Sequence, residues 1–226
     1  MPARKKEPKD LTAKKNLALE VIDRLKKEYP DAGCTLDYDH AWQLLVSVRL
    51  AAQCTDARVN IVVEDLFARY PSVAALAAAE PEDIEAIVKP CGLGHSKARD
   101  ISACMRMLRD KYNCQVPTTF EELLALPGVG RKSANLIMGD VFGKPAIVTD
   151  THCIRLCNKI GLVDGIKEPQ KVEMALWKIV PPEEGSDLCH RFVMHGRAVC
   201  NARKPECEKC CLSDICRYAR EEASNV

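Results

Sequence analysis

One stretch of ten residues, Leu126–Asn135, constrains the fold of this chain more than any other. The run before it, residues 120–126, has the pattern of a helix and stops at Pro127. Gly128 and Gly130 then frame a single apolar residue, and a second helical run follows. Glycines can take backbone conformations that are closed to residues with a side chain. The stretch therefore predicts a helix, a tight hairpin and a second helix.

The hairpin also carries chemistry. The N–H groups of the glycines and of the first turn of the second helix would point outward as an anion site. Arg131 and Lys132 open that helix, and its positive end disfavours the ammonium form of Lys132, which helps to make the amine a nucleophile. A plain connector with a solvated lysine would have the same pattern. On this stretch alone, a nucleic-acid role and a structural role both stay open.

Composition narrows the class of protein. A chain of 226 residues with 47% hydrophobic and only 5% aromatic residues is typical of one or two helical domains. The formal net charge is +1, so any nucleic-acid surface must be a local patch. No apolar run could span a bilayer, and residues 1–10 lack the apolar core of a signal peptide. We therefore expect no membrane contact and a cytoplasmic location, with attachment to the nucleoid only through DNA.

The pattern along the chain predicts an all-α fold of nearly a dozen short helices. Residues 2–15 are basic and proline-containing, and indicate a flexible arm that is either solubilising or helps to hold DNA. The apolar run 41–53 predicts a buried central helix. Ser96 is expected to cap a long amphipathic helix, and Asp150 to begin the helix that ends at Gly161. No alternation of period two supports a strand.

Four cysteines near the C-terminus have the spacing of metal ligands. They follow the pattern C-x6-C-x2-C-x5-C, and they are Cys200, Cys207, Cys210 and Cys216. Four thiolates without a histidine fit either structural zinc or a [4Fe–4S] cluster, and the chemistry alone leaves both open. Cys211 breaks this spacing and is interpreted as a bystander, and the other eight cysteines, with Cys153 and Cys157 among them, are interpreted as buried hydrophobic residues. Arg203 and Lys204 would be presented rigidly by a metal-stapled loop, as suits phosphate contacts, or are simply solvated charges.

The combination resembles the endonuclease III branch of the helix-hairpin-helix DNA glycosylases. Four segments carry the resemblance, and they are residues 126–132, 148–152, 195–197 and the cysteine tail. The resemblance implies two helical lobes with a DNA groove between them. Residues 35–144 would form a six-helix barrel with the helix-hairpin-helix at about 119–142. Residues 16–34 and 145–226 would form a domain around a [4Fe–4S] cluster, and residues 1–15 would be the arm.

The resemblance also implies a reaction and its residues. Members excise oxidised pyrimidines from double-stranded DNA and cut the strand at the abasic site by β-elimination through a lysine Schiff base. Lys132 would be the nucleophile and Asp150 would assist it, in addition to capping its helix. The residues that would contact DNA are Gln53, Leu93, Gly128, Gly130, Arg131, His152, Arg155, Arg203 and Lys204. Gln53 would fill the hole left by the flipped nucleotide and Leu93 would wedge between bases. The family also implies a monomer.

Two alternatives are weaker. An adenine-removing glycosylase of the same superfamily shares the cysteine tail, but it lacks the lysine nucleophile and has a further C-terminal domain. In this chain Lys132 is present and the sequence ends soon after Cys216. A non-catalytic DNA-binding module would not need both Lys132 and Asp150.

Overall fold

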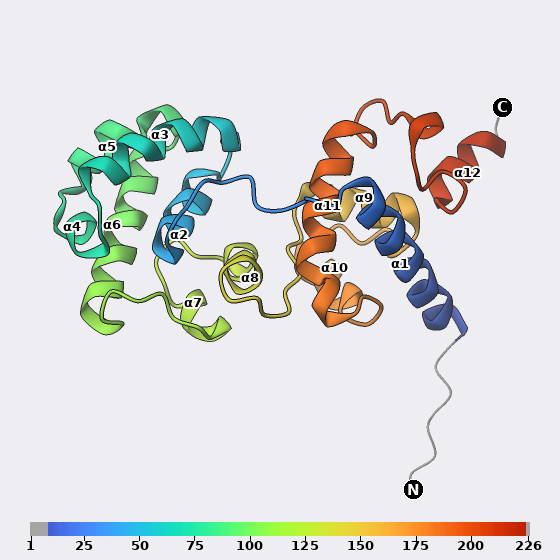
Figure 1. The fold of residues 1–226 in the computed structure, drawn as a ribbon, viewed down its shortest axis with the longest axis horizontal. Coiled ribbons are helices and arrows are strands. Elements are labelled where there is room, and N and C mark those ends of the chain that lie inside the picture. The colour runs from blue at the N-terminus through green and yellow to red at the C-terminus, as the bar shows by residue number, and fades with distance from the viewer. Residues whose placement is uncertain (1–8, 225–226) are drawn as a thin grey trace, which may run out of the picture. The chain divides into compact units, whose positions relative to one another are not determined.

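The structure, a computed structural model, describes residues 9–224. Over this range the chain forms helices and turns without a strand, which confirms the prediction of an all-α fold. The helices fall into two compact units (Figure 1). One unit is Cys34–Gly143, and the other combines residues 9–33 with residues 144–224. None of the helices in the described range is both long and apolar enough to cross a membrane.

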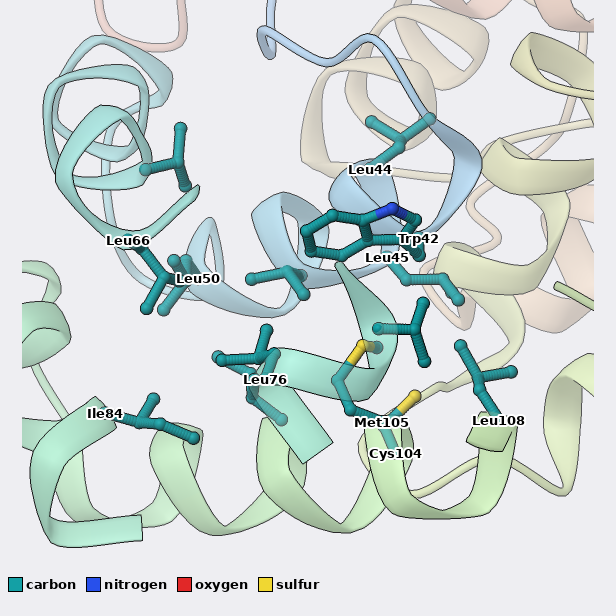
Figure 2. Close-up of a cluster of buried hydrophobic side chains, with 14 of the residues drawn as sticks. Trp42, Leu44, Leu45, Leu50, Leu66, Leu76, Ile84, Cys104, Met105 and Leu108 are labelled. Carbon is teal, nitrogen blue, oxygen red and sulfur yellow. The ribbon is translucent and has the colours of Figure 1, made fainter. Parts of the chain in front are cut away.

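The unit Cys34–Gly143 is built on a continuous apolar core. Its helices are α2 (Ala41–Leu50), α3 (Asp56–Arg69), α4 (Val73–Ala78), α5 (Pro81–Val88), the 3-10 helix η1 (Lys89–Cys91), α6 (Gly94–Lys111), α7 (Phe120–Leu124) and α8 (Arg131–Asp140). The long helix α6 packs against both α4 and α5. Figure 2 shows Trp42 and Leu45 of α2 on the side of this core that faces Met105 and Leu108 of α6. The prediction that the run 41–53 contains a buried central helix is thus confirmed for α2.

Several helix ends follow directly from the sequence, because caps act locally. The Thr55 and Ser72 side chains accept hydrogen bonds from the first turns of α3 and α4, and Thr119 does the same for α7. The start of α6 differs from the prediction. This helix begins at Gly94, and the Ser96 hydroxyl does not cap it but accepts a hydrogen bond from Arg49 at 3.2 Å.

The second unit joins the N-terminal helix to the C-terminal third of the chain. Its helices are α1 (Lys9–Glu28), α9 (Thr151–Ile160), α10 (Pro169–Leu176), η2 (Pro182–Glu184), α11 (Gly185–Ala198), η3 (Cys207–Lys209) and α12 (Arg217–Ser224). α11 packs against α1 and α9, and α12 packs against α9 (Figure 1). Val21 and Leu25 of α1 are fully buried, as is Phe192 of α11. The helix predicted for the N-terminal segment therefore contributes its apolar face to the core.

The extent of the basic arm needs a correction. Residues 1–8 lie outside the described part of the chain, but residues 9–15 form the first turns of α1 and are not a flexible arm. Lys14 of these turns forms an ion pair with Asp164. The apolar residues that follow, with Ala18, Val21 and Leu25 on one buried face, continue the same helix.

Candidate active site

The hairpin between α7 and α8 has the geometry of a type II turn. The Val129 N–H donates a hydrogen bond to the Leu126 carbonyl at 3.1 Å, with Pro127 and Gly128 between them. Gly128 has φ of 74°, in the left-handed region. Proline in the second position and glycine in the third are the residues that this turn type favours. The predicted helix, hairpin and helix are therefore present.

Gly128 is also required by close packing. A Cβ atom on Gly128 would lie 2.9 Å from the Cβ of Asp100 and 3.1 Å from the Cδ of Arg49. These two side chains form a partly buried ion pair, with the Arg49 Nε 2.7 Å from the Asp100 carboxylate. The backbone of the hairpin thus rests directly on an ion pair between α2 and α6. Both the conformation and the contact exclude a side chain at this position.

Gly130 behaves differently from the prediction. Its φ of −97° and ψ of 177° are extended values that any residue adopts, and no atom lies within 4 Å of a Cβ built on it. The expectation that both glycines take conformations closed to other residues is therefore wrong for Gly130. Because it precedes the first turn of α8, the open space beside it is next to the free N–H groups of that helix.

Lys132 lies in the first turn of α8, two residues after the helix-capping Gly130, and its side chain is exposed. The neighbouring Arg131 is half-buried, and its guanidinium lies over the ring of Phe120 at 5.0 Å from the centroid. The structure therefore places an exposed amine beside the hairpin, at the amino end of a helix. The catalytic role of Lys132 and the DNA contact of Arg131 stay predictions.

Asp150 occupies the start of α9 as predicted. Its Oδ1 accepts a hydrogen bond from the Cys153 N–H at 2.7 Å, which caps the helix. Within residues 9–224 the cap engages only Oδ1, so Oδ2 is available for other chemistry. Lys132 belongs to the unit Cys34–Gly143, whereas Asp150 belongs to the other unit. Their meeting across a groove stays a prediction.

The two residues expected to enter DNA share an unusual backbone conformation. Gln53 has φ of 58°, and Leu93 has φ of 50° with ψ of 35°. Non-glycine residues seldom adopt these left-handed values, and such strain gathers at functional sites. The Gln53 side chain is exposed, and Leu93 exposes 57% of its surface although it is apolar. The backbone thus presents both side chains outward at a cost in conformational energy.

A buried lysine was missed by the sequence interpretation. Lys97 has no exposed surface, and its Nζ donates hydrogen bonds to the carbonyls of Leu50 at 2.8 Å and Cys91 at 2.9 Å. Burial lowers the pKa of its ammonium group. A signal for it exists, because Lys97 falls four residues before Ile101 and eight before Met105, on the apolar face of α6. A lysine at that position of a core-facing stripe indicates a buried cation.

The four tail cysteines lie near one another in the second unit. Burial and the nearby thiols raise the pKa values of Cys200, Cys207 and Cys210, the last to about 12. Cys216 is buried and its thiol donates to the Lys159 carbonyl at 3.5 Å. Within residues 9–224, no three His, Cys, Asp or Glu side chains are placed closely enough to hold a single metal ion. A metal centre at the four cysteines stays a prediction.

Side chains from α1 and α11 form hydrogen bonds around these cysteines. The Nε2 of the buried His195 lies 3.3 Å from the Cys210 Sγ, and its Nδ1 lies 3.0 Å from the Tyr29 hydroxyl. Burial lowers the pKa of His195 to about 4. Arg24 of α1 donates to the Cys211 carbonyl at 2.9 Å and to Asp214 at 2.9 Å. α1 therefore fixes the cysteine loop, a contact that sequence spacing did not predict.

Arg155 and His152, both expected to line the DNA groove, have internal contacts. The Arg155 guanidinium donates to the Gly196 and Cys200 carbonyls at 3.2 Å and 2.8 Å, and lies 3.2 Å from the His152 Nδ1. A Cβ on Gly196 would lie 2.4 Å from that Nδ1, so the glycine permits this approach of α9 to α11. Arg155 therefore has a structural role. Its DNA contact is untested.

The two cations of the cysteine loop, Arg203 and Lys204, are exposed as predicted. The Lys204 N–H donates to the Asn201 side chain at 2.8 Å, which fixes the turn that carries both residues. Cys153 and Cys157 are fully buried, with their sulfurs 3.9 Å apart. The interpretation of these two cysteines as core residues is confirmed.

Comparison with known proteins settles the family. Residues 46–182 match the family described as HhH-GPD superfamily base excision DNA repair protein. Endonuclease III of Synechocystis sp. is 42% identical to this chain, over 93% of this chain and 96% of the relative. Endonuclease III of Escherichia coli strain K12 is 38% identical, over 88% and 94% of the two chains. The chain belongs to the endonuclease III family.

The likeness to endonuclease III holds for the fold as well as for the sequence, because a solved structure of that enzyme superimposes on this chain. It is described as a trapped endonuclease III–DNA covalent intermediate in an estranged-adenine complex. Its sequence is 40% identical, its TM-score is 0.87, and the match covers 92% of this chain and 98% of that chain. The predicted fold, with its helix-hairpin-helix, and the predicted activity of a base-excision repair DNA glycosylase and lyase are thus confirmed at the level of the family.

Proposed function

We propose that this protein removes oxidised pyrimidines from double-stranded DNA and cleaves the strand at the resulting abasic site, with Lys132 as the nucleophile. The observation that supports this proposal most directly is an exposed amine at the amino end of the helix after the hairpin. The likeness to an endonuclease III that was trapped covalently on DNA supports a covalent mechanism. Abasic sites present in the duplex would be substrates as well.

The reaction proceeds by covalent catalysis at the sugar. The lone pair of the neutral Lys132 Nζ attacks C1′ of the extruded nucleotide, and the bond from C1′ to the base breaks. The base leaves with the electron pair and takes up a proton. Opening of the sugar ring gives a Schiff base between Nζ and C1′. A proton is then lost from C2′, the bond between C3′ and oxygen breaks, and the 3′ phosphate departs.

Asp150 assists the step in which positive charge develops on the sugar. A carboxylate stabilises that charge electrostatically and can manage the protons of the ring-opening steps. Because the cap of α9 engages Oδ1, Oδ2 is the oxygen assigned to this work. Capping fixes the carboxylate in one orientation, so the structural and catalytic roles support each other.

The hairpin and the strained loops position the DNA. A phosphate binds the free N–H groups at the start of α8, beside Gly128, Gly130 and Arg131. The absence of a side chain on Gly130 leaves the space that such an oxygen needs. Gln53 fills the hole in the stack and Leu93 wedges between bases, and their positive φ values support a functional reason for these conformations.

A [4Fe–4S] cluster would be held by Cys200, Cys207, Cys210 and Cys216. Burial raises the pKa values of the Cys200, Cys207 and Cys210 thiols, so a positive centre would be needed to hold them as thiolates. When bound, the cluster would staple the loop that presents Arg203 and Lys204 to phosphates. We further propose that the protein acts as a monomer, in the cytoplasm.

Covalent trapping tests the proposal. Borohydride reduction of the protein on duplex DNA with a thymine glycol or an abasic site is expected to give a stable protein–DNA adduct. Lys132→Ala is expected to abolish the adduct, whereas Lys111→Ala, at an exposed lysine in the last turn of α6, keeps it. Trapping that survives Lys132→Ala would remove Lys132 from its role. Oligonucleotides with different single lesions then define the substrate range, and excision of adenine alone would contradict the proposed substrate class.

A further inference from the structure

We propose that Lys97 is a positioning residue for base extrusion, because its buried Nζ ties the Gln53 turn to the Leu93 loop. This inference rests on the proposed function, in which Gln53 and Leu93 enter the DNA from two separate loops. Nothing in the chemistry at the sugar requires Lys97. Its work is to set the distance between two side chains that must reach one extruded nucleotide together.

The hydrogen bonds of Lys97 lead directly to the two loops. One acceptor is the carbonyl of Leu50, the last residue of α2 and three residues before Gln53, at 2.8 Å. The other is the carbonyl of Cys91, the last residue of η1 and two residues before Leu93, at 2.9 Å. A single amine therefore joins the bases of both loops.

Burial makes this arrangement costly unless the hydrogen bonds are needed. Lys97 has no exposed surface, and burying a charged amine is unfavourable unless hydrogen bonds replace the lost water. An apolar residue of similar length would fill the same space without that cost. Its acceptors are two carbonyls at helix ends, where backbone oxygens lack partners within the helix. The amine thus satisfies both ends at once.

The strained backbone at Gln53 and Leu93 explains why the hydrogen bonds from Lys97 are required. Gln53 and Leu93 both have positive φ values, and each such residue is held only where the surrounding structure determines it. Released from Lys97, the two loops can relax toward ordinary conformations and separate. A displacement of about 1 Å can lower a rate by roughly 100-fold when it misplaces the groups that orient a substrate. Loss of the tie should therefore affect the steps that need both loops.

The experiment compares a step that needs base extrusion with one that does not. Lys97→Met keeps the length and apolar stem and removes the amine, and Lys111→Met, on the same helix but exposed, is the matched control. The first substrate is duplex DNA with one thymine glycol. The second is a single-stranded oligonucleotide with an abasic site, which has no base to extrude and no partner strand to enter. Single-turnover rates are divided by the active fraction obtained from borohydride trapping.

The expected result is selective. Lys97→Met lowers the rate on the duplex lesion by about 10- to 100-fold and keeps the wild-type rate on the single strand. Lys111→Met changes neither rate. In a protein that carries both Gln53→Ala and Leu93→Ala, adding Lys97→Met should have little further effect on the duplex lesion, because Lys97 acts through those residues.

Other results overturn the inference. Equal losses on both substrates would show that Lys97 only stabilises the fold, and unchanged rates on both would show that the tie has no role. If Lys97→Met does not fold, Lys97→Gln keeps an amide donor on a shorter stem, and the same ratio of rates decides. If the wild-type protein neither excises thymine glycol nor traps on the abasic strand, the proposed function itself fails, and this inference fails with it.

Discussion

Replacing Gly128 with alanine tests how the hairpin is held. The added Cβ would lie 2.9 Å from the Cβ of Asp100, an atom that moves only with the backbone of α6. Forcing alanine into the left-handed conformation costs about 1–2 kcal/mol. Overpacking destabilises the protein by a further amount of about 1–3 kcal/mol. The lower conformational entropy of the unfolded alanine variant offsets about 0.4–1 kcal/mol of this loss. We therefore expect Gly128→Ala to lower the free energy of unfolding by about 1–4.5 kcal/mol.

Gly130→Ala is the matched control, because only the structure distinguishes the two glycines. Gly130 has an extended backbone and no neighbour within 4 Å of an added Cβ. Its substitution should change the free energy of unfolding by no more than about 0.5 kcal/mol. The new methyl group would instead occupy the space assigned to a phosphate. Gly130→Ala should therefore weaken DNA binding without destabilising the protein.

Urea unfolding followed by far-ultraviolet circular dichroism measures the first effect, and fluorescence anisotropy with a duplex containing a reduced abasic site measures the second. Equal denaturation midpoints for Gly128→Ala and Gly130→Ala, at equal slopes, would refute the argument from conformation and contact. Wild-type affinity in Gly130→Ala would refute the assignment of the phosphate site.

Three further predictions concern the second unit and the charges. Asp150→Asn should keep the cap on α9 and the affinity for DNA, and should lower single-turnover excision by about 100-fold or more; loss of binding would make Asp150 structural. The purified protein should be brown with about four iron atoms per chain, and Cys210→Ser should reduce the visible absorbance; a colourless zinc protein would contradict the cluster. The association constant for DNA should fall steeply with salt despite a net charge of +1, and Lys204→Ala should reduce the logarithmic slope by about 1; a flat salt dependence would exclude a local phosphate-binding patch.

Caps are local interactions, which is why the sequence predicted the start of α9 at Asp150 correctly. Thr55, Ser72, Thr119 and Asp150 each bond to an N–H group within three residues, so a short window contains the whole interaction. The start of α6 was wrong for the opposite reason. The Ser96 hydroxyl bonds to Arg49, which lies 47 residues away, and no window around Ser96 contains this partner.

The spacing of the four cysteines likewise predicted a metal site, but it did not predict which residues from other segments contact the cysteine loop. The contact of His195 with Cys210, and that of Tyr29 with His195, join segments up to 166 residues apart. Arg155 also has partners that the family pattern does not reveal. Its guanidinium donates to the Gly196 and Cys200 carbonyls, and its contact with DNA stays a prediction. A motif identifies a residue type at a position, but burial and partners decide what the side chain does.

The DNA-handling parts of the unit Cys34–Gly143 share one support, which the sequence does not reveal. Lys97 and Asp100 are three residues apart on α6, a rise of about 4.5 Å along the helix. Lys97 holds the bases of the Gln53 and Leu93 loops, and Asp100 pairs with Arg49 of α2 beneath Gly128. The proposed phosphate site and the two loops proposed to enter the stack are therefore positioned from the same turn of one helix. We predict that a phosphate bound at the hairpin fixes where both loops meet the duplex. Binding of the DNA backbone and extrusion of the base would thus be coupled through α6.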